Sequence, residues 1–76
     1  MYTTVNFYLC AYLLSTGMAL TDHWKDGHQT VFGFDESAEL DQRIQEYFSM
    51  QARVEPIAYG NAVRNLKSII HADHTA

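Results

Sequence analysis

The sequence predicts a small single domain of the α+β class, in which a β-hairpin packs against three helices. Three features favour this fold: an uncharged apolar stretch of helical length at the start, two short apolar segments around an Asp-Gly turn, and two later segments with amphipathic helical spacing. With 76 residues, the chain is long enough for one domain only. The expected order of elements is α-β-β-α-(β)-α, where the parenthesis marks a short third strand over residues 52–54 that the sequence leaves open.

The first helix is expected from Val5 to about Thr16, with Thr4 as its N-cap and Gly17 as the left-handed residue that ends it. The segment from Met1 to Thr21 contains no charged side chain, so this helix has almost no polar face. Such a helix is expected to be buried. Because no basic residue precedes the apolar run and polar residues interrupt it, we expect neither a signal peptide nor a membrane span.

Residues 18–34 are predicted to form the hairpin, and the turn chemistry allows two registers. A two-residue turn at Asp26-Gly27 would place both phenylalanines of the second strand on the face away from Leu20. A three-residue loop over Lys25, Asp26 and Gly27 instead builds one apolar face, so we predict this bulged type. Its inner face would comprise Met18, Leu20, Phe32 and Phe34, and its outer face Thr21, His23, Gln29 and Val31.

Two further helices complete the predicted fold. The second begins after a cap at Asp35 or Ser37 and reaches about Met50. The third begins near Pro56 and runs to about His71, while residues 1–3 and 72–76 are expected to fray. The apolar stripe of the second helix comprises Leu40, Ile44, Tyr47 and Phe48, and that of the third comprises Tyr59, Ala62, Val63, Leu66, Ile69 and Ile70.

Three segments resemble a known family. They are NFYLCAYLLSTGM, the hairpin end VFGFDES and the helical segment ARVEPIAYGNAVRNLKSII, and together they extend from Asn6 to Ile70. On these segments the chain resembles the short phage and bacterial proteins of the domain of unknown function family DUF5659. The resemblance implies the fold described above and an origin in a phage or other mobile element, and it implies no activity.

Catalysis, metal binding and cofactor binding are not expected. Cys10 is the single cysteine, which excludes an internal disulfide and the usual zinc frameworks and fits a reducing, cytoplasmic location. His23 and His28 lie on opposite faces in the predicted register, and His71 and His74 near the end add no third ligand. The chain also lacks a nucleophile with a neighbouring base, a phosphate-binding loop and a dinucleotide fingerprint.

The aromatic content favours a protein-protein interface. One Trp, five Tyr and four Phe are many for 76 residues, and Tyr and Trp are enriched where an apolar area meets a polar edge. We therefore expect a homo-oligomer, or an interaction module for a host or phage protein, that uses the first helix. The predicted interface comprises Phe7, Tyr8, Ala11, Tyr12 and Trp24.

A polar face on the third helix suggests an alternative function. Nucleic acid is disfavoured as a partner by the formal charge of −4, which results from 5 Lys plus Arg against 9 Asp plus Glu. Nevertheless, several amide and basic side chains gather on one side of the third helix or just before it. They are Arg53, Asn61, Arg64, Asn65 and Lys67, and they form either a binding face for an acidic or phosphate-bearing partner or an ordinary solvated helix face.

Overall fold

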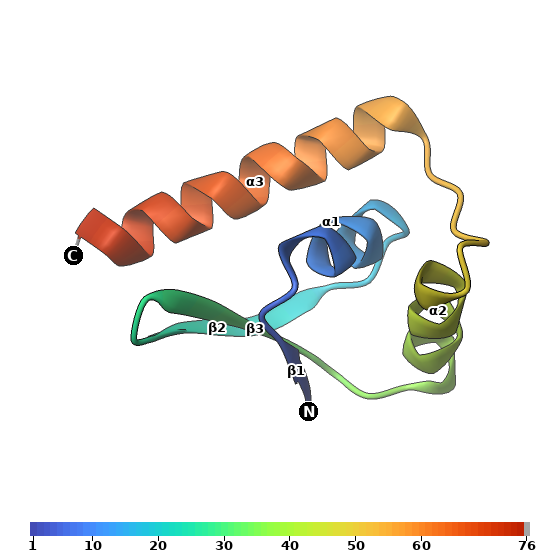
Figure 1. The fold of residues 1–76 in the computed structure, drawn as a ribbon, viewed down its shortest axis with the longest axis horizontal. Helices are drawn as coiled ribbons and strands as arrows, with labels where there is room; N and C mark the ends of the chain where they lie inside the picture. Colours follow the sequence, from blue (N-terminus) through green and yellow to red (C-terminus); the bar gives the residue numbers. More distant parts are fainter. Residues whose placement is uncertain (76) are drawn as a thin grey trace.

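The computed structural model describes the backbone of residues 1–75 and the side chains of residues 1–72. The fold is α+β, as the sequence predicts, with three helices and a three-stranded antiparallel sheet of strand order β1-β3-β2. In Figure 1, α1 lies between α3 and the sheet, and α2 lies beside α1. The elements are β1 (Tyr2–Thr4), α1 (Phe7–Ser15), β2 (Leu20–Asp26), β3 (Gln29–Phe34), α2 (Ala38–Phe48) and α3 (Pro56–Thr75).

The third strand is β1, which the sequence analysis placed in a fraying N-terminus. Tyr2 pairs with Phe34 and Thr4 with Phe32, so β3 has a partner on both of its edges. The N-terminal ammonium also lies 3.1 Å from a carboxylate oxygen of Glu36. The expectation of fraying at residues 1–3 is therefore wrong, and residues 52–54 form no strand. At the other end, α3 continues past the predicted end to Thr75, and Ala76 lies outside the described residues.

The hairpin differs from both predicted registers because its turn contains Gly27 and His28. Asp26 pairs with Gln29, which leaves a two-residue turn, and Gly27 has a φ of 63°. This is the first turn position, where type II′ hairpin turns place glycine. A β-bulge at Thr21 then shifts the register within β2, and the Thr21 hydroxyl donates to the Gly33 carbonyl at 3.0 Å.

The bulge explains why part of the predicted inner face is correct although the register is wrong. Leu20 pairs with Phe34 beyond the bulge, and both phenylalanines of β3 are buried. His23 pairs with Phe32 and therefore lies on the helix side of the sheet, contrary to its predicted outward position, although it stays exposed. Trp24 pairs with Val31 on the opposite face, which no helix covers.

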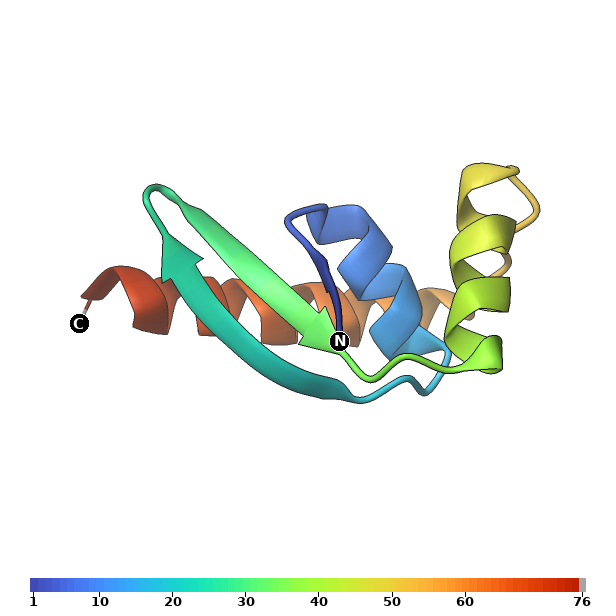
Figure 2. The same cartoon turned by 90° about the horizontal axis from the view of Figure 1, so that it is seen from below.

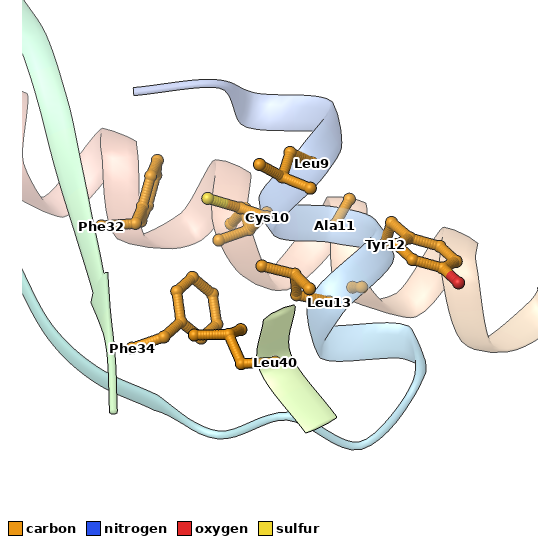
Figure 3. Close-up of a cluster of buried hydrophobic side chains, with 10 residues drawn as sticks. Leu9, Cys10, Ala11, Tyr12, Leu13, Phe32, Phe34 and Leu40 are labelled. Carbon is orange, nitrogen blue, oxygen red and sulfur yellow. The ribbon is translucent and has the colours of Figure 1, made fainter. Parts of the chain in front are cut away.

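Helix α1 forms the centre of the hydrophobic core. Leu9, Cys10 and Leu13 are fully buried, and the helix contacts both α2 and α3. In Figure 3 the thiol of Cys10 points toward Phe32, while the Tyr12 ring extends in the opposite direction. A helix with neighbours on several sides needs apolar side chains on several sides, which explains its missing polar face.

Side chains cap the helices at their first turns. Asn6, and not Thr4, is the N-cap of α1, because its Oδ1 accepts from the Leu9 N–H at 3.1 Å. Thr4 instead accepts from the Asn6 N–H. Ser37 caps α2 in the same way at 3.0 Å from the Leu40 nitrogen, as one of the two predicted caps.

Left-handed residues end α1 and α2. Gly17 has a φ of 98°, and the following N–H donates to the Leu13 carbonyl at 3.0 Å, which confirms the predicted glycine C-cap. Helix α2 ends at Phe48 because Met50 takes the same role with a φ of 63°, and the Gln51 N–H donates to the Glu46 carbonyl at 3.0 Å.

Candidate interaction surface

Aromatic rings from α1 and α2 meet where the two helices pack. The ring centroids of Tyr12 and Tyr47 are 5.8 Å apart, and Tyr47 makes an edge contact with Phe48 at 5.2 Å. On α1, Phe7 and Tyr8 make a similar edge contact at 5.3 Å. These spacings are typical of attractive aromatic pairs.

Tyr59 brings the third helix to this cluster. Burial raises the pKa of the Tyr59 phenol, and the neighbouring phenols of Tyr47 and Tyr8 raise it further. Like Tyr47 and Phe7, Tyr59 also packs against the hydrophobic core. We call Tyr8, Tyr47, Phe48 and Tyr59 the aromatic surface.

Two members of the aromatic surface are largely exposed. Tyr8 and Phe48 each expose 62% of their area, although both contact other rings. In Figure 2 the first turn of α1 and the last turn of α2, which carry these residues, lie on the same side of α3. An exposed aromatic edge on a rigid helical scaffold is suited to protein contacts, because aromatic residues supply large buried areas at interfaces.

An ion-pair network borders the aromatic cluster on α2. The Arg43 guanidinium donates to Glu46 at 3.1 Å and lies 3.6 Å from Glu39. The hydrogen bond with Glu46 raises the pKa of Arg43, and Tyr12 also adds to this shift from the cluster side. These three charges of α2 are therefore engaged with one another.

The structure revises the predicted interface. Ala11 and Tyr12 are buried inside the chain, at 0% and 4% exposure, so neither can offer a free surface in this fold. Phe7 is half-buried against the core, and Trp24 lies on the uncovered face of the sheet, away from the helices. Of the predicted residues, Tyr8 alone belongs to the aromatic surface.

The sequence analysis assigned Tyr47 and Phe48 to the core stripe of α2, and Tyr59 to that of α3. Their periodic spacing correctly predicted which side of each helix faces the core, but spacing alone does not show where α2 ends. Phe48 is the last residue of α2, two positions before the left-handed Met50, and its side chain is 62% exposed. The gathering of Tyr47, Phe48 and Met50 at the end of the predicted helix was the sequence signal for an exposed aromatic residue there.

The residues of the predicted polar face are all exposed. Asn61 and Asn65 line a groove of about 370 Å³ between the end of α1 and the first half of α3. Arg64 Nη2 donates to Asn61 Oδ1 at 2.9 Å beside this groove. Lys67 follows Arg64 by one turn of α3 and does not line the groove, and Arg53 lies in the loop before the helix.

Within the described side chains, no group of three or more His, Cys, Asp or Glu residues could hold a metal ion. The side chains of Asp73 and His74 lie outside the described residues. Burial raises the pKa of the Cys10 thiol to about 12, so this thiol stays protonated and is a poor nucleophile. Among residues 1–75, no helix is both long enough and apolar enough to cross a membrane.

The chain is thus a small α+β domain in which helices cover one face of the sheet and carry exposed aromatic side chains. The chain belongs to the family described as Domain of unknown function (DUF5659), which matches residues 1–72. This membership agrees with the resemblance seen in the sequence, and the family description assigns no activity. Searches of curated proteins and of solved structures returned no match.

Proposed function

We propose that this protein is a small non-catalytic interaction module that associates with a second copy of itself through the aromatic surface. The observation that supports this function is the 62% exposure of both Tyr8 and Phe48, each of which makes an edge contact with a neighbouring ring of its own helix. Exposed aromatic residues beside packed ones are typical of the anchors that dominate protein interfaces.

A second copy fits this surface for two physical reasons. A chain of 76 residues buries only about 60% of the surface that its unfolded state exposes, so association adds burial that the monomer lacks. The four residues of the aromatic surface are also uncharged, whereas the whole chain carries a formal charge of −4. Two copies can therefore meet at this surface with little charge repulsion, as a twofold interface requires.

The proposed setting is the cytoplasm of a cell that carries a phage or other mobile element. A single buried thiol, Cys10, fits a reducing compartment. The mobile-element origin is supported by the family resemblance alone.

Sedimentation equilibrium over a wide concentration range tests the proposed function. We expect a mass above 8.7 kDa for the unaltered chain and a return to 8.7 kDa in Tyr8→Glu and in Phe48→Glu. Trp24→Glu is the matched control, because it places the same charge at an exposed aromatic residue on the other side of the molecule. A monomer at every concentration, or an equal effect of Trp24→Glu, would contradict the proposal.

Nucleic-acid binding is the alternative, and the exposed Arg53, Arg64 and Lys67 are the observation that favours it. The net charge of −4 opposes it. A gel shift with single-stranded DNA or RNA at low salt would support this alternative if it weakened with added salt and in Arg64→Ala. Absence of a shift at low salt would exclude direct binding.

A further inference from the structure

We propose that the groove between α1 and α3 binds an extended peptide strand that carries an acidic side chain. The groove is a separate surface from the aromatic one. The inference rests on the proposed function in one respect, that the chain acts by binding proteins, and it names a chemical class of partner. The groove is lined by Leu14, Ser15, Ala58, Asn61, Ala62 and Asn65.

Two side-chain amides on one wall of the groove are spaced like alternate residues of an extended peptide. Asn61 and Asn65 are four residues apart on α3, which corresponds to about 6 Å along the helix axis. Alternate residues of an extended peptide are about 6.6 Å apart and present their N–H and C=O groups to the same edge. Each amide offers two donor hydrogens and an oxygen with two lone pairs, so Asn65 can pair with both groups of one peptide residue, and Asn61 can do so with the lone pair that Arg64 leaves open.

The floor of the groove allows a main chain to approach closely. Ala58 and Ala62 lie one helical turn apart on α3, and Ser15 lies opposite at the end of α1. These are small side chains, and Leu14 adds an apolar contact. A volume of about 370 Å³ is within the range of about 300 to 1,000 Å³ that is usual for binding pockets.

The charge beside the groove selects an acidic partner. None of the six lining residues is charged, and Arg64 stands next to Asn61 with its guanidinium donating to Asn61 Oδ1 at 2.9 Å. Arg64 forms no ion pair among the described side chains that would neutralise it. An Asp or Glu of the bound strand can therefore pair with Arg64, whose guanidinium already lies against Asn61 in the wall of the groove.

Fluorescence anisotropy with a labelled, end-capped octapeptide of alternating Val and Glu tests this inference directly. We expect saturable binding with a Kd below about 1 mM, and binding at least about tenfold weaker for the matched Val-Lys octapeptide. N-methylation of alternate residues keeps the Glu side chains but removes the N–H groups facing the amides, and it should abolish binding. No binding of the Val-Glu peptide, or equal binding of its N-methylated form, would overturn the inference.

Variants of the groove locate the site. Asn65→Asp preserves the shape but replaces the donor by a negative charge, so it should weaken Val-Glu binding about tenfold or more. Arg64→Gln should weaken it about fivefold, whereas Lys67→Gln, which removes the same charge one turn further along α3 from a side chain that does not line the groove, should change it much less. Unchanged affinity in Asn65→Asp, or an equal loss in Lys67→Gln, would show that the groove is not the site.

Two controls separate this inference from the proposed self-association. Tyr8→Glu should release the second copy yet retain Val-Glu binding, because Tyr8 does not line the groove. If Asn65→Asp instead lowers the sedimentation mass, the groove holds a second copy and the peptide assignment is wrong. If single-stranded DNA displaces the peptide in an Arg64-dependent manner, the groove binds phosphate and the assignment is also wrong.

Discussion

Tyr12 and Tyr47 pack with their ring centroids 5.8 Å apart and their planes inclined by 38°, and this contact joins α1 to α2. Tyr12 is only 4% exposed, whereas Tyr8, one turn earlier on the same helix, is 62% exposed. Two tyrosines of one uncharged helix therefore have different roles, one in the core and the other at the surface.

Truncation of these two tyrosines should have unequal effects on stability. Tyr12→Ala should lower the free energy of unfolding by about 3 kcal/mol, because it removes a buried ring, and Tyr8→Ala by less than about 1 kcal/mol. A double-mutant cycle of Tyr12→Leu and Tyr47→Leu should give a coupling of about 0.5 to 1.5 kcal/mol. Urea denaturation of a dilute sample measures both quantities, and equal losses in the two alanine variants would contradict the assigned burial.

Met50→Gly should stabilise the protein. In residues 1–75, Met50 is the one non-glycine residue with positive φ, at 63°, and its side chain is 94% exposed. A left-handed conformation costs an L-residue about 1–2 kcal/mol, so glycine should raise the free energy of unfolding by about 1 kcal/mol after its own entropy cost. The neighbouring Gln51 does not have a positive φ, so Gln51→Gly should lower the stability. A loss of stability in Met50→Gly would disprove the left-handed helix end.

Alanine at two glycines should change stability in opposite directions. At Gly27 and Gly60 an added Cβ would meet no atom within 4 Å, so steric contact affects neither substitution. Gly27→Ala should lower the free energy of unfolding by about 1 kcal/mol, because its φ is 63°. Gly60→Ala should raise it by about 1 kcal/mol, because Gly60 lies inside α3. Thermal unfolding of both variants under one condition checks the sign, and a common sign would contradict the turn geometry.

Local sequence signals predicted the helices of this fold better than its sheet. The glycine that ends α1, the Ser37 cap and the apolar stripes were predictable because each depends on residues a few positions apart. The Gly27-His28 turn was not, because the bulge at Thr21 changes the face of Leu20 without any local signal. Strand β1 depends on pairing with β3 about thirty residues later, and a short segment such as Tyr2–Thr4 carries too little pattern to predict this pairing.

The aromatic content of the sequence pointed to the first helix, but it did not show which aromatic residues are exposed. The excess of aromatic residues led to the prediction of an interface on the first helix, and of the aromatic residues of α1 only Tyr8 is exposed. Which tyrosine of α1 is buried depends on where α2 and α3 cross it, and this crossing is a long-range property. Helical spacing placed Asn61 and Asn65 on one polar side of the third helix, whereas the groove that they line also requires the end of α1.

Stability should fall in alkaline solution because of the buried thiol of Cys10. Burial raises the pKa of this thiol from its ordinary value of 9.0 to about 12. Between these two values the unfolded chain releases a proton that the folded chain retains, so an increase in pH favours unfolding. The contribution of the thiol is fully present below pH 9 and is lost as the pH approaches 12. One such group contributes a slope of at most about 1.4 kcal/mol per pH unit.

Urea denaturation at intervals between pH 8 and pH 11 measures this fall, and Cys10→Ala isolates the part due to the thiol. The alanine variant should be less stable at pH 8, because it leaves a small cavity, but its stability should decrease less steeply with pH. Tyr59→Phe should flatten the remaining slope, since burial also raises the pKa of the Tyr59 phenol. Parallel pH profiles for Cys10→Ala and the unaltered chain would mean that the thiol ionises equally in both states. Cys10 would then be accessible to solvent, and the central place of α1 in the core would be wrong.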